Sequence, residues 1–154
     1  MHIKNYTSSV PVDRSISLIE YHLVQAGAKD IAKSYDDEQN VVGIIFNIPV
    51  NGDRLLFKLP ARWQRVFDKM LLERNKSSRR PIKPTALEEL KKQAKRTAWK
   101  ILVDKVQIQV TNILIDQEDV VEAFFPYLYN GKRDQTAYEI MRDKNYIGLL
   151  GDGK

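Results

Sequence analysis

The fold is decided by residues 85–129, which read TALEELKKQAKRTAWKILVDKVQIQVTNILIDQEDVVEAFFPYLY and hold neither proline nor glycine before Pro126. Thr85 and Glu88 have the spacing of a capping box, so a helix is predicted to begin there. Apolar residues then recur at steps of three and four, as on one face of a helix: Trp99, Leu102, Val106, Val110 and Ile113. Many neighbouring residues are β-branched and favour a strand, but the length of the run decides for helix.

A polar run over residues 116–119 interrupts this stretch. It predicts a bend or a cap before a second helical piece over 120–125, which Pro126 ends because proline cannot continue a helix. Three signals complete the C-terminal part: a turn at Asn130-Gly131, a capping box at Thr136 and Glu139 that opens a helix to about Lys144, and a frayed end over 148–154.

Upstream of residue 85 the sequence predicts both strands and helices. The predicted elements are a strand over 2–12, an amphipathic helix from Asp13 or Ser15 to Gly27 with a stripe of Ile16, Ile19, Leu23 and Ala26, strands over 30–35, 41–50 and 54–59, and a helix over 61–75. Asn51-Gly52 predicts a hairpin, because a type I′ turn needs positive φ at both central residues. Residues 76–84 hold two prolines and four positive charges without periodicity, which predicts a loop.

The order of elements predicts an α+β fold: a small antiparallel sheet of about four strands, in the order β-α-β-β-β, packed against helices and followed by a long C-terminal helical region. The length fits a single domain over 1–154, with the sheet and two helices in 1–75, a basic loop in 76–84 and a helical extension in 85–154. The chain has no cysteine, which excludes disulfides and thiolate chemistry. No apolar run approaches the ~18 residues of a membrane-spanning helix, so a cytoplasmic protein is expected.

The net charge of +5 is spread unevenly. Residues 1–61 hold 6 basic and 7 acidic side chains, residues 62–105 hold 14 and 5, and residues 106–154 hold 5 and 8. The segments thus carry −1, +9 and −3, and the basicity belongs to the middle third. Such a block attracts polyanions, and the alternative is a solvated surface with flexible lysines.

The basic residues of the middle third are the candidate nucleic-acid-binding site, because together they can meet several phosphates at once. They are Arg79, Arg80 and Lys83 in the loop, and Lys91, Lys92, Lys95 and Arg96 on the helix. Phe46 and Phe57 on neighbouring strands are candidates for stacking on bases. The alternative for these two rings is a place in the hydrophobic core.

No motif points to catalysis or to a cofactor. The two histidines, His2 and His22, have no partner at metal-ligand spacing, and Asp36-Asp37-Glu38 lacks the glycine and the spaced oxygens of a calcium loop. Glycine-rich phosphate loops and framed nucleophilic serines are absent from the sequence as well. We therefore predict a non-enzymatic protein with no catalytic residue, no metal and no cofactor.

The run Lys91–Ala98 resembles the K-K-x-A-K-x-x-A signature of the second helix in double-stranded-RNA-binding domains. In that family the lysines open the helix directly after the third strand. Here a helix over 61–75 and a proline-bearing loop intervene. We therefore assign these lysines to a helix surface, on which Glu88 and Lys92 can pair at i, i+4.

Several short segments together resemble an uncharacterised family of small proteins encoded by bacteriophages and other bacterial mobile elements. They are Tyr6–Val12, Ile19-Glu20 with Gly27-Ala28, Phe57–Ala61, Ala98–Ile101 and Phe125–Leu128. The similarity covers nearly the whole chain and implies a bacterial cytoplasmic setting during infection or element maintenance, with no catalytic residue. Similar proteins have a tryptophan-rich helix after the Ala-Trp pair, where this chain has Asp104–Gln107.

Two functions follow from these observations. The first is a non-enzymatic phage or mobile-element accessory protein whose segment Arg79–Lys100 contacts nucleic acid or a ribonucleoprotein. The second is a counter-defence protein, either an anti-CRISPR-like inhibitor that binds a host defence protein or a sponge that sequesters a nucleotide signal. An oligomer is compatible with either function.

Overall fold

The computed structural model describes residues 1–149 and 151, so residues 150 and 152–154 of the end expected to fray lie outside the described residues. The fold is α+β, which confirms the fold class predicted from the sequence. The helices are α1 (Val12–Gln25), α2 (Trp63–Ser77), α3 (Pro84–Leu114), α4 (Val120–Phe124), the 3-10 turn η1 (Phe125–Tyr127) and α5 (Ala137–Asp143). The strands are β1 (Asp30–Tyr35), β2 (Val41–Val50), β3 (Asp53–Pro60), β4 (Tyr129–Asn130) and β5 (Gln135–Thr136).

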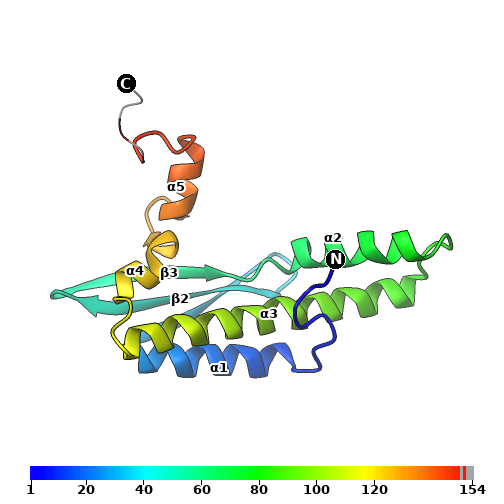
Figure 1. The fold of residues 1–154 in the computed structure, drawn as a ribbon, viewed down its shortest axis with the longest axis horizontal. Helices are drawn as coiled ribbons and strands as arrows, with labels where there is room; N and C mark the ends of the chain where they lie inside the picture. Colours follow the sequence, from blue (N-terminus) through cyan, green and yellow to red (C-terminus); the bar gives the residue numbers. More distant parts are fainter. Residues whose placement is uncertain (150, 152–154) are drawn as a thin grey trace.

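The strands β1, β2 and β3 form an antiparallel sheet in that order, and α1 and α3 cover one of its faces (Figure 1). The side chains on the covered face alternate with outward ones at the strand period of two. Those buried there are Ile44, Phe46 and Ile48 of β2 and Phe57 and Leu59 of β3. Asn51 and Gly52, with φ of 51° and 87°, join β2 to β3, which confirms the predicted hairpin.

The core lies between this sheet and the two helices. The predicted stripe of α1 is buried through Ile16, Ile19 and Leu23, and α3 buries Trp99, Leu102, Val103, Val106 and Val110. Phe124 of α4 completes the core, with its ring centroid 5.4 Å from that of Phe46 and 5.8 Å from that of Phe57. Phe124 is therefore one anchor of the C-terminal part on the sheet, and Leu128, which pairs with Phe57 of β3, is another.

The strand expected over residues 2–12 does not form. The chain makes a turn there instead, and Pro11 is the N-cap residue of α1. In a strand, the backbone carbonyl groups of this segment would pair with a neighbouring strand. Here the carbonyl oxygens of Tyr6 and Ser8 instead accept hydrogen bonds from Gln93 Nε2 of α3, at 2.9 Å each. The main sheet consequently has three strands, and all three follow α1.

The helix α3 begins near the predicted residue, but the predicted side-chain cap is not the one that starts it. The helix begins at Pro84 with no side-chain cap, so the capping box of Thr85 and Glu88 does not form. Proline suits the first turn because the N–H that it lacks would have no partner there. The side-chain caps expected for α1, from Asp13 or Ser15, are also missing in the described part of the chain.

The two helix starts predicted further downstream are confirmed. The helix α3 ends at Leu114, and Asp119 caps α4 by accepting a hydrogen bond from the backbone N–H of Glu122 at 2.8 Å. At the start of α5, Thr136 and Glu139 form both bonds of a capping box. Side-chain caps close to each helix start therefore determine where the helices after α3 begin.

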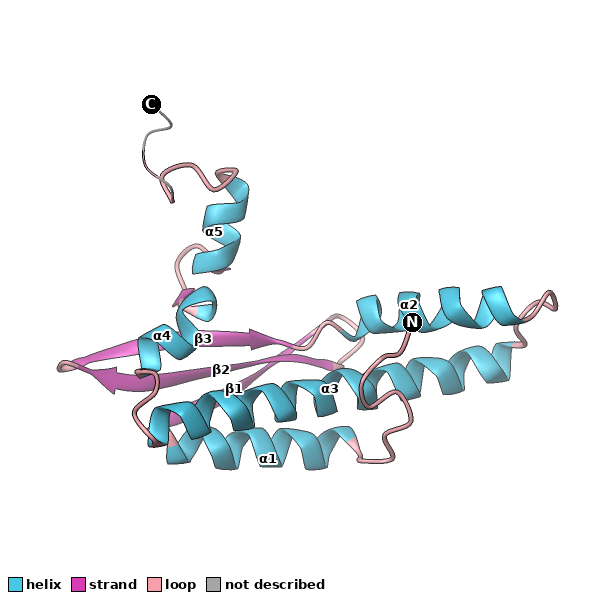
Figure 2. Cartoon of the chain, in the orientation of Figure 1, coloured by secondary structure: helices cyan, strands magenta, loops and turns pink. Residues whose placement is uncertain are grey.

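The helices α2 and α3 run antiparallel and side by side, and together they project beyond the end of the sheet (Figure 2). Residues 78–83, named the tip loop, connect them at the far end. Among the described residues, no helix combines the length and the apolar character that crossing a bilayer requires.

Candidate nucleic-acid interface

Residues 62–96 are named the basic hairpin. They comprise α2 with its N-cap residue, the tip loop and the first part of α3. This segment holds twelve basic and four acidic side chains, which gives it a net charge of +8 in a chain whose total is +5. The rest of the chain therefore carries −3. The positive potential is concentrated at the end that projects from the sheet.

The tip loop presents the most accessible of the predicted cations. Arg79, Arg80 and Lys83 are exposed, and none of them forms an ion pair within the described part of the chain. Arg74 holds the loop in place, since its Nη1 donates to the Arg80 carbonyl oxygen at 2.6 Å. One proline within the loop and one directly after it restrict the backbone further.

Lys91 and Lys92 of α3 have acidic neighbours. Lys91 Nζ lies 3.3 Å from Glu88 Oε1, and Lys92 Nζ lies 3.4 Å from Glu89 Oε1, one helical turn away. Exposed pairs of this kind stabilise a helix by only a few tenths of a kcal/mol. They still reduce the positive charge that this part of the predicted site offers to a phosphate.

The other two predicted cations of α3 are half-buried and bond to neighbouring side chains. Lys95 Nζ donates to Asn40 Oδ1 at 2.8 Å and lies 4.7 Å from the centroid of the Trp63 ring, so it ties α3 to the β1–β2 turn and to α2. Arg96 Nε donates to Gln93 Oε1 at 3.2 Å. Both side chains are half-buried and contribute to packing as well as to charge.

The expectation that Phe46 and Phe57 form a base-stacking platform is wrong. Their rings stack on each other with centroids 5.3 Å apart, and the residues are only 1% and 0% exposed. They lie on the sheet face that α1 and α3 cover, and Phe124 packs against both. These rings have no face open to a base.

The helix α2 and its N-cap supply further cations, which were not among the predicted site residues. Arg65 and Lys69 are exposed on it, Arg62 is exposed directly before it, and Arg74 supports the tip loop. In the sequence, Trp63, Val66, Phe67 and Met70 form an apolar stripe at helical spacing, and these basic side chains fall outside it. Their place beside the cations of α3 follows from the packing of the two helices, which the sequence does not reveal.

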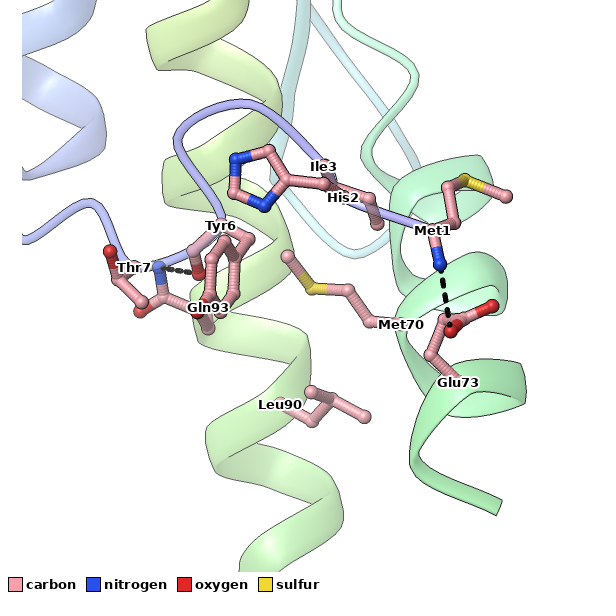
Figure 3. A pocket seen from close by; sticks show the side chains of 9 residues that line it. All are labelled: Met1, His2, Ile3, Tyr6, Thr7, Met70, Glu73, Leu90 and Gln93. Carbon is pink, nitrogen blue, oxygen red and sulfur yellow. Dashed lines mark hydrogen bonds and ion pairs between the residues drawn. The ribbon is translucent and has the colours of Figure 1, made fainter. Parts of the chain in front are cut away.

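A pocket of about 880 Å³ lies between the N-terminal segment, α2 and α3 (Figure 3). Its walls include Ile3, Tyr6, Met70, Glu73, Leu90 and Gln93. Met70 and Leu90 extend toward each other from the two helices, and the Tyr6 ring lies to one side of them. The Met1 amino group lies 3.3 Å from Glu73 Oε2, and this hydrogen bond holds the pKa of Glu73 below its usual range.

Asp104 fastens the N-terminal segment, and with it this pocket, to α3. Its carboxylate accepts from Asn5 Nδ2 at 2.9 Å and from Lys100 Nζ at 2.9 Å, and Lys4 Nζ lies 3.3 Å away. Burial alone would raise the pKa of Asp104, but these hydrogen bonds outweigh it and hold the pKa below its usual range.

Replacement of Asp104 by asparagine is expected to lower the free energy of unfolding by about 1–2 kcal/mol at pH 7, because charge-assisted bonds are lost. Since the folded-state pKa is depressed, this contribution is present above a pH of about 4 and disappears as the pH falls through the folded pKa. Urea unfolding of both proteins at neutral and acidic pH measures the difference. Asp68→Asn, on the exposed surface of α2, should change little, and an equal loss in both variants would refute the proposed role of Asp104.

The described residues contain no cluster of three or more side chains able to hold a metal ion. The ring of His2 lies edge-on to Tyr6 and the ring of His22 edge-on to Tyr21, each pair with centroids 5.5 Å apart. Asp36 Oδ1 accepts from two backbone N–H groups of its own turn. Asp36 thus closes the turn that joins β1 to β2.

Comparison of the chain with protein-family models, with curated proteins and with solved structures finds no match. The resemblance to bacteriophage and mobile-element proteins stays a prediction.

Proposed function

We propose that the protein is a non-enzymatic accessory protein of a bacteriophage or mobile element, which binds nucleic acid or a ribonucleoprotein in the cytoplasm of the bacterial host. The observation that carries this proposal is the basic hairpin, which projects from the sheet with a net charge of +8. In this proposal the basic hairpin contacts the phosphates of the nucleic acid, mainly through the three cations of the tip loop.

The chemistry of the tip loop suits phosphate oxygens. A guanidinium group offers a fixed fork of donors that matches two oxygens of one phosphate, and a lysine supplies a compact point charge. Arg79 and Arg80 are neighbours, and the support from Arg74 reduces the conformational freedom lost on binding. Phosphate contacts fix position without reading sequence, so affinity for different sequences is expected to be similar.

The test is a gel-shift titration at low salt with single- and double-stranded DNA and RNA. Replacing Arg79, Arg80 and Lys83 together by glutamate is expected to weaken binding by more than about tenfold, because favourable phosphate contacts become repulsive. Reversing the four cations of α3, Lys91, Lys92, Lys95 and Arg96, is expected to weaken binding as well, with an added loss of stability from the broken Lys95 contacts.

A matched control separates the position of the charges from their number. Lys132, Arg133 and Lys144 are exposed on the C-terminal part, and their replacement by glutamate changes the net charge by the same amount. This variant should keep most of the affinity. Absence of binding by the wild-type protein at low salt, or an equal loss in both triple variants, would sink the proposal.

The counter-defence function remains the second candidate because of one observation, the pocket beside the hairpin. A cavity of about 880 Å³ is within the size range of small-molecule sites. A thermal-shift screen with cyclic nucleotides tests it, and a rise in melting temperature without any binding of long nucleic acids would favour a nucleotide sponge. Inhibition of a host defence protein would instead appear as a stable complex in a pull-down with that protein.

A further inference from the structure

Two hollows adjoin on one flank of the basic hairpin. The first is the pocket of about 880 Å³, and the second, of about 620 Å³, has Arg74, Ile82 and Arg96 in its walls. Leu90 and Gln93 line both hollows. The two therefore form one groove, named the α2–α3 groove, which has an apolar end and a cationic end.

The apolar end has the shape and chemistry that a flat aromatic group requires. Met70 and Leu90 offer apolar surface from opposite helices, and the ring of Tyr6, a residue 51% exposed, stands beside them (Figure 3). Aromatic and thioether side chains both contact π-systems favourably. Polar groups at the margin, on Thr7 and Glu73, can bond to the polar edge of such a group.

The cationic end contains two guanidinium groups whose direction is already set. Arg74 donates to the Arg80 carbonyl oxygen and Arg96 donates to Gln93, which leaves each with further N–H donors. The carboxylate in this end belongs to Glu89, which forms an ion pair with Lys92. An anion with several acceptor oxygens, such as a phosphate diester, complements this arrangement.

We infer that the α2–α3 groove binds one unpaired nucleotide of a single-stranded nucleic acid, with the base in the apolar end and its phosphate between Arg74 and Arg96. The inference rests on the proposed function and adds the class of ligand. A base within a duplex has both faces stacked and its polar edge paired, so it cannot enter the groove unless it leaves the helix. Single strands present bases that stack on side chains at little cost.

The test compares a single strand of about 12 nucleotides with the duplex of the same sequence, by fluorescence anisotropy at low salt. Leu90→Lys fills the apolar end while adding a positive charge, so any loss of affinity cannot come from weaker electrostatics. It is expected to weaken single-strand binding about tenfold and to leave duplex binding equal or tighter. Leu114→Lys, an exposed leucine at the far end of α3, adds the same charge and should change neither affinity.

A second variant guards against misfolding of the first. Tyr6→Ala removes a half-exposed ring and is expected to weaken single-strand binding about tenfold as well, with thermal melting unchanged. Equal effects of Leu90→Lys and Tyr6→Ala on strand and duplex would overturn the inference but leave the proposed function intact. If the tip-loop variant lost all binding while Leu90→Lys and Tyr6→Ala bound as the wild-type protein does, the inference would also be overturned and the proposed function would stand. A nucleoside monophosphate that binds when no strand does would assign the groove to a free nucleotide and overturn both proposals.

Discussion

Phe124→Ala is expected to lower the free energy of unfolding by about 3–5 kcal/mol. The side chain is 0% exposed, and its ring contacts the stacked rings of Phe46 and Phe57 on the sheet. Alanine would leave a cavity where three aromatic rings meet, and it would weaken the packing of α4, whose other core contacts are made by Val120 and Ala123. Chemical unfolding followed by circular dichroism measures the change, provided that both proteins unfold in a single transition.

The adjacent residue offers a matched control. Phe125 is 53% exposed, so Phe125→Ala removes the same atoms from solvent-facing surface and should change stability by less than about 1 kcal/mol. A similar loss in both variants would show that Phe124 does not anchor the C-terminal part. Below its melting temperature, the Phe124 variant should bind nucleic acid as the wild-type protein does, because the basic hairpin lies outside this cluster.

Raising the salt concentration from about 50 to about 200 mM is expected to weaken nucleic-acid binding by about 10³-fold, the effect of roughly six phosphate contacts. Each neutralised phosphate releases counterions, so the logarithm of the affinity falls linearly with the logarithm of the salt concentration. The tip loop supplies three such contacts through Arg79, Arg80 and Lys83, and exposed cations of α2 and α3 supply the others.

Replacing those three tip-loop residues by glutamine is expected to reduce the slope of this plot by about 2 to 3, roughly one per lost contact. Anisotropy titrations at several salt concentrations give the slope directly. Glutamine at Lys132, Arg133 and Lys144 should leave it unchanged. A flat salt dependence of the wild-type protein would contradict phosphate binding and would favour an interface of apolar contacts.

The parts of the fold that depend on neighbours in the sequence could be predicted. The Asn51-Gly52 hairpin, the buried stripe of α1 and the capping box of Thr136 and Glu139 each follow from local backbone or periodic rules, and all three are present. The break after α3 belongs to the same group, since its cap Asp119 lies directly before α4.

The parts that depend on distant residues could not be predicted. The segment expected as a strand over 2–12 is held instead by Gln93 and Asp104, whose side chains reach it only after α3 packs in place. The strand positions of Phe46 and Phe57 were correct, but the face that the helices cover is set by packing. The α2–α3 groove likewise exists only once two separate helices adjoin.

The helix α3 runs without interruption from the tip loop to the far end of the core, over 31 residues. At 1.5 Å per residue it is about 46 Å long, and its second half is fixed to the sheet by Val103, Val106 and Val110. Residues 85–114 hold neither proline nor glycine, the usual causes of a sharp kink. The same helix therefore fixes the direction in which the basic hairpin points from the sheet.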